Sequence, residues 1–190
     1  MTRIIAGTAK GRRVRTPAGD VTRPTSDRVR EALFSALEAQ FGSLHGLRVL
    51  DLYAGSGAVG LEAASRGATA VLAVESDRRT AALIAENART LGLAVEVSAH
   101  PVERVLTAPA REPFDVVFLD PPYPLPAEAV TEALGLLATG GWLSEGAAVV
   151  VERSRRSVEP AWPDGLGTAR QKKYGETVLW YLRRPEATEE

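Results

Sequence analysis

Short apolar runs alternate with longer amphipathic stretches along most of this 190-residue chain. The apolar runs, each of strand length, lie at 47–52, 69–75, 94–98, 114–120 and 147–152. The stretches between them, with apolar residues at helical spacing, lie at about 57–66, 77–92, 101–108 and 126–139. This alternation is typical of a parallel sheet with crossover helices. The pattern therefore predicts an α/β fold whose most continuous apolar runs are strands buried on both faces.

The two ends of the chain add a helix before the sheet and a hairpin after it. Thr25 or Ser26 is a suitable N-cap for a helix that continues to about Phe41. Near the C-terminus, the segments 168–174 and 176–183 flank a Tyr-Gly pair and leave no room for a helix between them. They predict an antiparallel hairpin that closes the sheet.

Composition fits one domain and argues against several kinds of site. The chain is 45% hydrophobic and 25% charged, which is enough to build a sizeable core at this length. With no cysteine and only His45 and His100, neither disulfides nor a zinc centre is expected, and no metal is predicted. No stretch approaches the roughly 18 apolar residues of a membrane span, and no signal peptide is evident. We therefore expect a cytoplasmic protein without a membrane partner.

Charge is distributed unevenly along the chain. Residues 1–30 carry eight Arg or Lys against two Asp, a balance of +6, so a net charge of −1 leaves −7 on residues 31–190. A basic segment of this kind is where contact with nucleic acid is expected. We therefore divide the chain into a basic N-terminal extension (1–24), one main domain (25–184) and a polar tail (185–190).

The first apolar run ends in a glycine-rich turn, Asp51-Leu52-Tyr53-Ala54-Gly55-Ser56-Gly57-Ala58-Val59-Gly60, which opens the next helix. Glycines in such a turn let the backbone approach a ligand closely. Glu75, twenty residues after Gly55, ends the following strand, where its carboxylate would reach the hydroxyls of a bound ribose. The predicted nucleoside site consists of Tyr53, Ala54, Gly55, Ser56, Gly57, Glu75 and Ser76.

The glycines alone do not identify the nucleoside, because the turn also satisfies G-x-G-x-x-G and thus suits a nicotinamide or flavin dinucleotide. Asp51, four positions before the first glycine, favours S-adenosylmethionine: a carboxylate there would receive the methionine ammonium but repel a pyrophosphate. No hydride-transfer apparatus is evident downstream. The loop after the third strand, with Ala99 and His100, is where the adenine ring would lie. S-adenosylmethionine is the predicted cofactor.

The fourth apolar run ends in Asp120-Pro121-Pro122-Tyr123. Consecutive prolines remove two backbone donors and fix the chain beyond the strand. The Asp120 carboxylate and the Pro121 carbonyl remain as acceptors, and two acceptors that hold the hydrogens of an exocyclic base amine would favour its attack on a sulfonium methyl group. Tyr123 offers a face on which an unpaired base would stack. These four residues are the predicted catalytic site.

Both motifs resemble those of known enzymes. The D-x-x-x-G-x-G stretch from Asp51 resembles the first motif of class I methyltransferases, and the tetrapeptide resembles the [DNS]-P-P-[YFW] motif of amino-group methyltransferases. The N-terminal segment, above all R-P-T-x-D-R-V-R-E at 23–31, is similar to the start of the RsmD family, and the likeness continues to Tyr174-Gly175-Glu176-Thr177.

The resemblance to the RsmD family implies more than the motifs do alone. It implies a seven-stranded class I methyltransferase fold with strand order 3-2-1-4-5-7-6, the seventh strand being antiparallel. It also implies methylation of guanine N2 in 16S rRNA of the small ribosomal subunit. Whether the acceptor is free rRNA or an assembled or partly assembled subunit stays open, although an enzyme with few base-reading groups can take specificity from ribosomal protein surfaces. Residues expected to follow the RNA backbone are Arg3, Lys10, Arg12, Arg13, Arg15, Arg23, Thr25 and Arg28.

Several alternatives stay open at this stage. A second basic set, Arg153, Arg155, Arg156, Arg170, Lys172 and Lys173, either extends the RNA surface or forms an ordinary charged face. A DNA adenine-N6 methyltransferase would share the tetrapeptide but would need a recognition insertion for which the chain has little room. An NAD-dependent oxidoreductase would share the glycine turn. A non-catalytic RNA-binding module would leave the tetrapeptide unexplained.

Overall fold

The computed structural model describes residues 2–19 and 25–187. The helices are α1 (Asp27–Phe41), α2 (Ala58–Ser65), α3 (Arg78–Leu91), α4 (Val102–Thr107) and α5 (Ala127–Thr139). The strands of the main sheet are β3 (Arg48–Leu52), β4 (Ala70–Val74), β5 (Glu96–Ser98), β6 (Phe114–Leu119), β7 (Leu143–Ser154), β8 (Arg170–Tyr174) and β9 (Thr177–Arg183). A separate ribbon at the N-terminus pairs β1 (Thr2–Arg3) with β2 (Arg13–Val14). Each helix and strand predicted from the periodicity is present, within a few residues.

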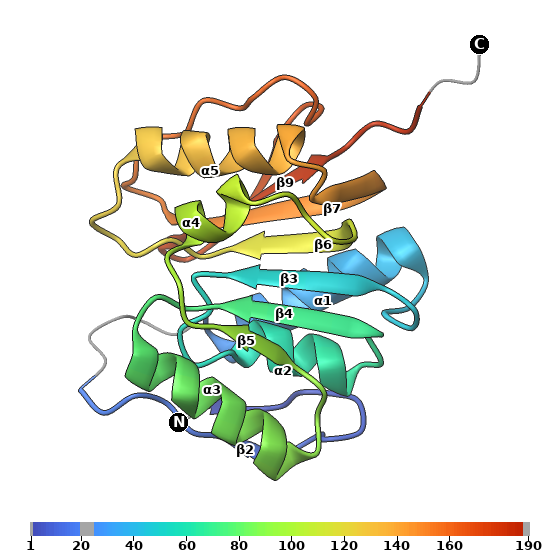
Figure 1. The fold of residues 1–190 in the computed structure, drawn as a ribbon, viewed down its shortest axis with the longest axis vertical. Coiled ribbons are helices and arrows are strands. Elements are labelled where there is room, and N and C mark those ends of the chain that lie inside the picture. The colour runs from blue at the N-terminus through green and yellow to red at the C-terminus, as the bar shows by residue number, and fades with distance from the viewer. Residues whose placement is uncertain (1, 20–24, 188–190) are drawn as a thin grey trace.

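The main sheet has the predicted α/β architecture (Figure 1). Its strand order is β5-β4-β3-β6-β7-β9-β8, which is the predicted 3-2-1-4-5-7-6 when the seven strands are counted along the chain. The first five strands in this order, from β5 to β7, are parallel to one another, whereas β9 runs antiparallel between β7 and β8. Because the arrowheads of β3, β4 and β6 point the same way, their carboxyl ends share one edge. A ligand of such a sheet binds at that edge.

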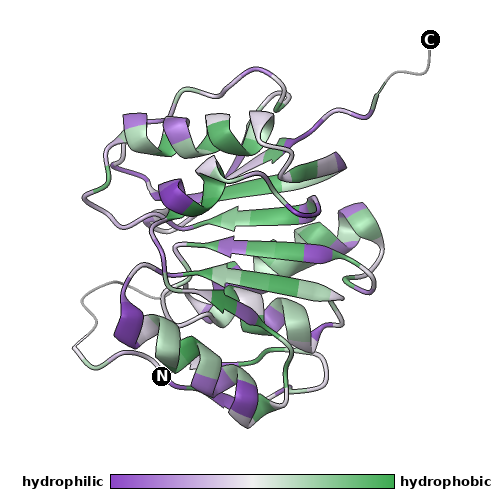
Figure 2. Ribbon diagram, in the orientation of Figure 1, coloured by the Kyte–Doolittle hydropathy of each residue, from purple (hydrophilic) through white to green (hydrophobic). Residues whose placement is uncertain are grey.

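Alternating residues of the central strands build two cores, one on each face of the sheet. On one face Leu50, Val117 and Val149 pack with α4 and α5. On the other face Val49 and Val150, with their neighbours, pack with α1 and α2. Figure 2 shows the result as largely hydrophobic strands, with hydrophilic positions recurring along α3 at the outside. The sheet is therefore the middle of three layers.

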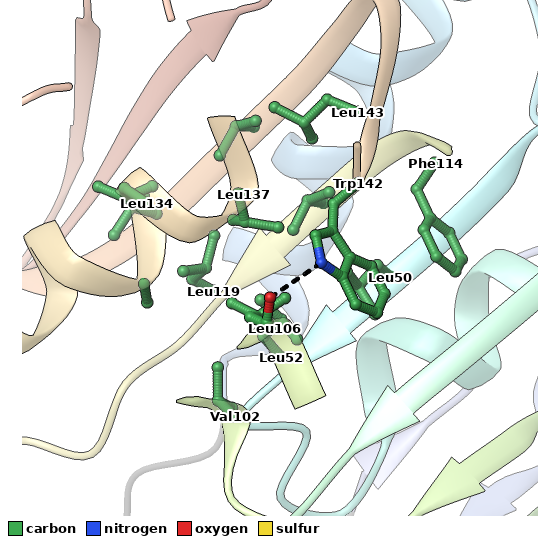
Figure 3. Close-up of a cluster of buried hydrophobic side chains, with 14 of the residues drawn as sticks. Leu50, Leu52, Val102, Leu106, Phe114, Leu119, Leu134, Leu137, Trp142 and Leu143 are labelled. Atoms are coloured by element: carbon green, nitrogen blue, oxygen red, sulfur yellow. Dashed lines mark hydrogen bonds between the residues drawn. The ribbon is translucent and has the colours of Figure 1, made fainter. Parts of the chain in front are cut away.

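The core on the α4–α5 face is fixed by a tryptophan (Figure 3). Trp142 is buried, stacks on Phe114 with ring centroids 6.2 Å apart, and donates its indole N–H to the Leu106 carbonyl at 3.2 Å. This satisfies the one polar atom of a large apolar side chain. The contact joins α4 to the beginning of β7, at the amino ends of the strands and thus away from the carboxyl edge.

Strand β7 is longer than predicted. It begins at Leu143 rather than at 147, and its pairing with β6 shifts register between Phe114 and Val116. The additional residues include Ser144 and Glu145, which are not fully buried, so their polarity concealed this part of the strand from the apolar pattern.

The N-terminal ribbon packs against the main domain and was not predicted. Ile4, Ala9 and Val14 form a small core with Leu61 of α2 and Leu91 of α3. Strands of two residues are too short to show a periodicity, which is why the sequence indicated only a basic extension.

A buried ionic cluster holds the ribbon in place. The fully buried Glu62 carboxylate accepts from the Ile5 and Ala6 backbone N–H groups at 2.8 and 3.0 Å. It also accepts from Arg66 Nε at 2.9 Å and lies 3.7 Å from Nε of Arg30. Arg30, itself 1% exposed, reaches back to Thr2 Oγ1 at 2.9 Å. Buried charges need this degree of pairing to be tolerated.

Helix α1 begins where the sequence indicates. Ser26 is the N-cap, and its hydroxyl accepts from the Val29 backbone N–H at 3.2 Å. Thr25, the other candidate cap, immediately precedes it and is buried. The cap therefore places Thr25 between the N-terminus of α1 and the carboxyl edge of the sheet.

Candidate active site

Three acidic side chains lie on one face of the sheet, at the carboxyl ends of the adjacent strands β3, β6 and β7. They are Asp51, Asp120 and Glu152. Residues two positions apart on a strand point to the same face of the sheet. Asp51 therefore shares a face with Val49, and Glu152 shares a face with Val150, and both valines belong to the core beneath α1 and α2. Since Leu119 pairs with Val151, the next positions on the two strands are Asp120 and Glu152. The fold thus gathers these carboxylates towards the N-terminus of α1.

The glycine turn after β3 is a compact backbone structure. Tyr53 has a positive φ of 57°, and among the residues described it is the one non-glycine with this left-handed conformation. Such strain is typical of ligand-binding turns. The Ala54 N–H donates to the Val74 carbonyl at 2.9 Å, and the Gly57 N–H donates to the Ala54 carbonyl at 2.8 Å. These bonds hold the turn against the end of β4.

Asp51 lies beneath the turn. Its side chain is buried, and Oδ2 accepts from the Gly60 backbone N–H at 2.9 Å. Burial raises the pKa of this carboxyl to about 8, although the Gly60 bond opposes the shift. A cation brought close to the carboxylate would favour its charged form. The carboxyl is therefore poised to ionise when a positively charged ligand group approaches.

Glu75 supports the turn from β4. Its Oε2 accepts from the Gly55 N–H at 2.9 Å, and its Oε1 accepts from the Asp77 N–H at 2.9 Å. Asp77 in turn caps α3, with its carboxylate accepting from the Thr80 N–H at 2.8 Å. These bonds fix the Glu75 carboxylate, whose remaining lone pairs are available to ligand hydroxyls.

The turn has one packed side and one open side. A Cβ built on Gly57 would lie 2.8 Å from Ile84 Cγ2 of α3, whereas a Cβ built on Gly55 would meet no atom within 4 Å. Both glycines have positive φ, 79° and 56°. The open side at Gly55, next to the Glu75 carboxylate, fits the close approach of a nucleoside such as S-adenosylmethionine.

The remaining predicted cofactor residues lie on loops at the same edge of the sheet. Ser76 follows β4, while Ala99 and His100 follow β5, and all three are exposed. They are therefore accessible to a ligand that lies across the strand ends.

The tetrapeptide Asp120-Pro121-Pro122-Tyr123 follows β6 at this edge. The Leu125 N–H donates to the Pro122 carbonyl at 2.9 Å, which closes a tight turn. Tyr123 is 66% exposed and presents its ring to solvent. The structure therefore brings an acidic strand end and an exposed aromatic ring close to the glycine turn of the neighbouring strand.

Asp120 lies in an unusual electrostatic setting. Burial of its carboxyl raises its pKa well above the ordinary range, and the neighbouring Glu152 carboxylate raises it further. A hydrogen bond from Thr25 and the positive charge of Arg153 oppose the shift. Arg153 is buried and donates from Nη2 to the Leu125 carbonyl at 3.2 Å, so it also braces the tetrapeptide turn. Perturbed carboxyls in such a setting mark functional sites.

Comparison with known proteins identifies the family. Residues 2–183 match the family described as "Conserved hypothetical protein 95". Over 187 residues the chain is 35% identical to "Ribosomal RNA small subunit methyltransferase D" of Escherichia coli K12, a match that covers 97% of this chain and 90% of that protein. The chain belongs to the RsmD family of class I methyltransferases.

Solved structures agree with this membership. A hypothetical protein of Thermus thermophilus superposes with a TM-score of 0.81 at 36% identity, covering 98% of this chain and 100% of that one. An RNA methyltransferase from Salinibacter ruber, in complex with S-adenosyl-L-homocysteine, shares the fold with a TM-score of 0.64 at 20% identity, covering 88% of this chain and 97% of that one. S-adenosylmethionine is accordingly the cofactor of this RsmD-family methyltransferase, as its glycine turn and Asp51 predicted.

The basic residues predicted to contact RNA fall into two groups. Lys10, Arg13 and Arg28 are exposed side chains. Arg3, Arg12 and Arg15 are also exposed but take part in internal contacts: Arg3 bonds the Gly11 carbonyl, Arg12 the Thr90 and Leu91 carbonyls, and Arg15 pairs with Glu86 at 2.5 Å. Arg23 lies outside the described residues. The internal contacts attach the ribbon to the C-terminal half of α3.

The structure also adds residues that sequence reasoning missed. Thr25 was predicted to contact RNA, but its buried hydroxyl faces the carboxylates of Asp120 and Glu152. Arg153 was grouped with a basic surface set, but its side chain is buried beside the tetrapeptide. The one available signal was the polar pair Glu152-Arg153, which directly follows the apolar run 147–151. Among residues 2–19 and 25–187, no cluster of His, Asp and Glu is arranged to hold a metal.

One further finding concerns the helices. Within the described part of the chain, none is both long and apolar enough to cross a membrane.

Proposed function

We propose that this RsmD-family methyltransferase transfers a methyl group from S-adenosylmethionine to the exocyclic N2 of a guanine in 16S rRNA. The observation that carries the proposal is the position of Asp120 and Tyr123, at the end of the strand next to the glycine turn. The E. coli relative is named for methylation of ribosomal RNA of the small subunit. The choice of guanine N2 rests on the tetrapeptide and on the resemblance of the N-terminal segment to the RsmD family.

Three groups of this chain would hold the cofactor. Glu75 would accept from the ribose hydroxyls, since its carboxylate is already fixed by two backbone N–H groups. The N-terminus of α2, which follows Gly57, suits the methionine carboxylate. Asp51 would receive the methionine ammonium through the oxygen not used by Gly60. When bound, S-adenosylmethionine supplies an electrophilic methyl group on a sulfonium.

Asp120 and Pro121 would orient the target amine. The Asp120 carboxylate and the Pro121 carbonyl would accept its two hydrogens, which directs the nitrogen lone pair towards the methyl carbon. The N–C bond forms as the C–S bond breaks, the bonding electrons pass to sulfur, and the nitrogen then loses one proton. Tyr123, with its exposed ring, would stack on the guanine. The base must therefore be unpaired or flipped out when it enters the site.

The exposed cations of the ribbon and of α1 would contact phosphates near the site. Lys10, Arg13 and Arg28 are suited to this because they are exposed. Phosphate contacts position an RNA without reading its sequence. Selection of one guanine would then depend on the shape of the RNA or on the surrounding subunit, which is why we propose a partly or fully assembled small subunit as substrate.

The test is transfer of labelled methyl from S-adenosylmethionine to naked rRNA and to small subunits from a strain that lacks the enzyme. Mass spectrometry of the nucleosides should find N2-methylguanosine at a single site. Asp120→Ala should abolish transfer while S-adenosylmethionine still binds. Asp164→Ala, at an exposed aspartate in the loop between β7 and β8, is the matched control and should retain activity. Absence of label from both RNA substrates, with label in adenine N6 when DNA is supplied in a parallel reaction, would overturn the proposed substrate.

A further inference from the structure

A threonine hydroxyl links the two carboxyls at the ends of β6 and β7. Thr25 Oγ1 lies 2.7 Å from Glu152 Oε2 and 3.3 Å from Asp120 Oδ2. The three residues are far apart in sequence, with separations of 95 and 127 residues from Thr25. The sheet parity that directs Asp120 and Glu152 to one face, together with the cap of α1, brings them together. This contact is therefore a product of the tertiary fold.

The hydroxyl has only one proton to donate. While Asp120 is ionised, the hydroxyl can donate to either carboxylate, and its bond to Asp120 lowers the Asp120 pKa. Once Asp120 carries a proton, the hydroxyl donates to Glu152, the partner at the shorter distance, and accepts from Asp120. The three groups then form one directed chain, from Asp120 through Thr25 to Glu152. A proton that arrives on Asp120 can leave along this chain by two short transfers between oxygens.

We propose that Thr25 and Glu152 form a proton relay behind Asp120, which removes the proton that the target amine loses on methylation. The inference deepens the proposed function and rests on it. Thr25 and Glu152 act through Asp120 and do not touch the reacting atoms, so they are positioning residues. The relay leaves the tetrapeptide free to grip the base, because the proton departs from the buried side of the carboxyl.

The proton balance of the step is simple. After the N–C bond has formed, the methylated nitrogen carries one proton too many, and Asp120 accepts it. Asp120 passes a proton to Thr25 Oγ1 as Thr25 passes its own to Glu152. The site gains one proton and the base returns to neutral. Glu152, which is 8% exposed, releases that proton to water when the products leave.

Charges around Asp120 support its role as a temporary proton carrier. Glu152 and Asp51 raise its pKa, whereas Arg153 and the Thr25 hydroxyl lower it. Tyr53 and Tyr123 are also close to this group, since both interact with Arg153. A raised pKa makes Asp120 a better proton acceptor than an exposed carboxylate, which matches the demand of the reaction.

The relay predicts opposite effects for two substitutions on the pH dependence of methyl transfer. Thr25→Val removes a hydrogen bond that lowers the Asp120 pKa, so the rising limb of the profile should move to higher pH. Glu152→Gln removes a charge that raises it, so the limb should move to lower pH. Both should lower the plateau rate by about tenfold to hundredfold, at or below the range of a positioned proton acceptor.

Single-turnover transfer to the small subunit, measured across a range of pH, gives these profiles. Thr25→Ser keeps the hydroxyl and should rescue both the limb and the plateau. Thr139→Val, which removes a hydroxyl at the end of α5, is the control for loss of a threonine elsewhere. Calorimetric binding of S-adenosylmethionine should be equal in all variants. A Thr25→Val enzyme with the wild-type plateau and limb would overturn the relay.

A second readout needs no RNA and separates the relay from the proposed substrate. The Asp120 carboxyl carbon, labelled with ¹³C, can be titrated by NMR in the protein alone. Its titration should move to higher pH in Thr25→Val and to lower pH in Glu152→Gln. If these shifts occur but no methyl reaches rRNA, the proposed function fails, whereas the coupling of Asp120 to Thr25 and Glu152 is supported. If Asp120 titrates identically in all three proteins, the relay is wrong.

Discussion

Replacing Asp51 by Asn should stabilise the folded protein and weaken its hold on S-adenosylmethionine. The Asn side chain has the same size, and its oxygen can still accept from the Gly60 N–H. It differs from Asp in having no charge to bury. The two effects are expected together because the buried Asp51 carboxylate lowers the stability of the ligand-free protein but can pair with the ammonium group of the bound ligand.

The magnitude follows from the pKa of Asp51, which burial raises from 3.8 to about 8. Over the pH range between these two values the folded protein binds more protons than the unfolded chain, so stability falls as pH rises. At 1.36 kcal/mol per pKa unit, the folded wild type should lose about 4 kcal/mol relative to Asp51→Asn between about pH 5 and about pH 8. Above about pH 8 the difference should level off.

Urea unfolding of both proteins at several pH values measures this difference directly. Binding of S-adenosylmethionine, followed by calorimetry, should strengthen with pH in the wild type as Asp51 ionises, and should be weaker and less dependent on pH in the variant. Parallel stability curves for the two proteins across this range would show that Asp51 does not carry the raised pKa, and the electrostatic reasoning would fail.

Three other substitutions test separate parts of the structure. Arg30→Met would leave the Glu62 carboxylate short of a buried partner, and urea unfolding should report a loss of about 3–5 kcal/mol; a loss below about 1 kcal/mol would contradict the role of the cluster. Gly57→Ala combines a left-handed backbone costing about 1–2 kcal/mol with a contact to Ile84, so its melting temperature should fall more than that of Gly55→Ala, whose Cβ meets open space. Tyr123→Ala should lower kcat/KM for the RNA by an amount equivalent to about 1–3 kcal/mol, whereas Tyr123→Phe keeps the stacking ring and should retain the wild-type kcat/KM. Equal kcat/KM values for the Ala and Phe variants would refute stacking.

The central sheet and its two motifs were predictable because their signals are local. The apolar runs at β3, β4 and β6 have the length and composition of buried strands, and each motif directly follows one of them. Parallel strands then bring the glycine turn and the tetrapeptide to one edge without further information. The family likeness supplied the strand order, which the structure reproduces.

The rest depends on contacts between distant segments. Thr25 is an ordinary helix-flanking residue until the fold brings it to Glu152, across 127 residues. Arg30 has the sequence context of an exposed basic residue, yet Glu62 of α2 draws it into the interior. The N-terminal ribbon owes its stability to α2 and α3 and not to its own two-residue strands. None of these pairings has a signature in a single sequence.

The alternation along β7 makes the chemistry of the site sensitive to insertions and deletions. Glu152 faces Asp120 and Thr25, whereas its neighbour Arg153 points to the opposite face and holds the Leu125 carbonyl. A slip of β7 by one residue would exchange them and put a guanidinium where a carboxylate belongs. Length changes in the turn before β7 should therefore be rare among active relatives. The loop between β7 and β8 should tolerate changes in its exposed first part, 155–159, but not at Leu166, which is fully buried, or at Trp162, which packs on Trp180. New RNA-binding segments grafted onto this scaffold should therefore enter at 155–159.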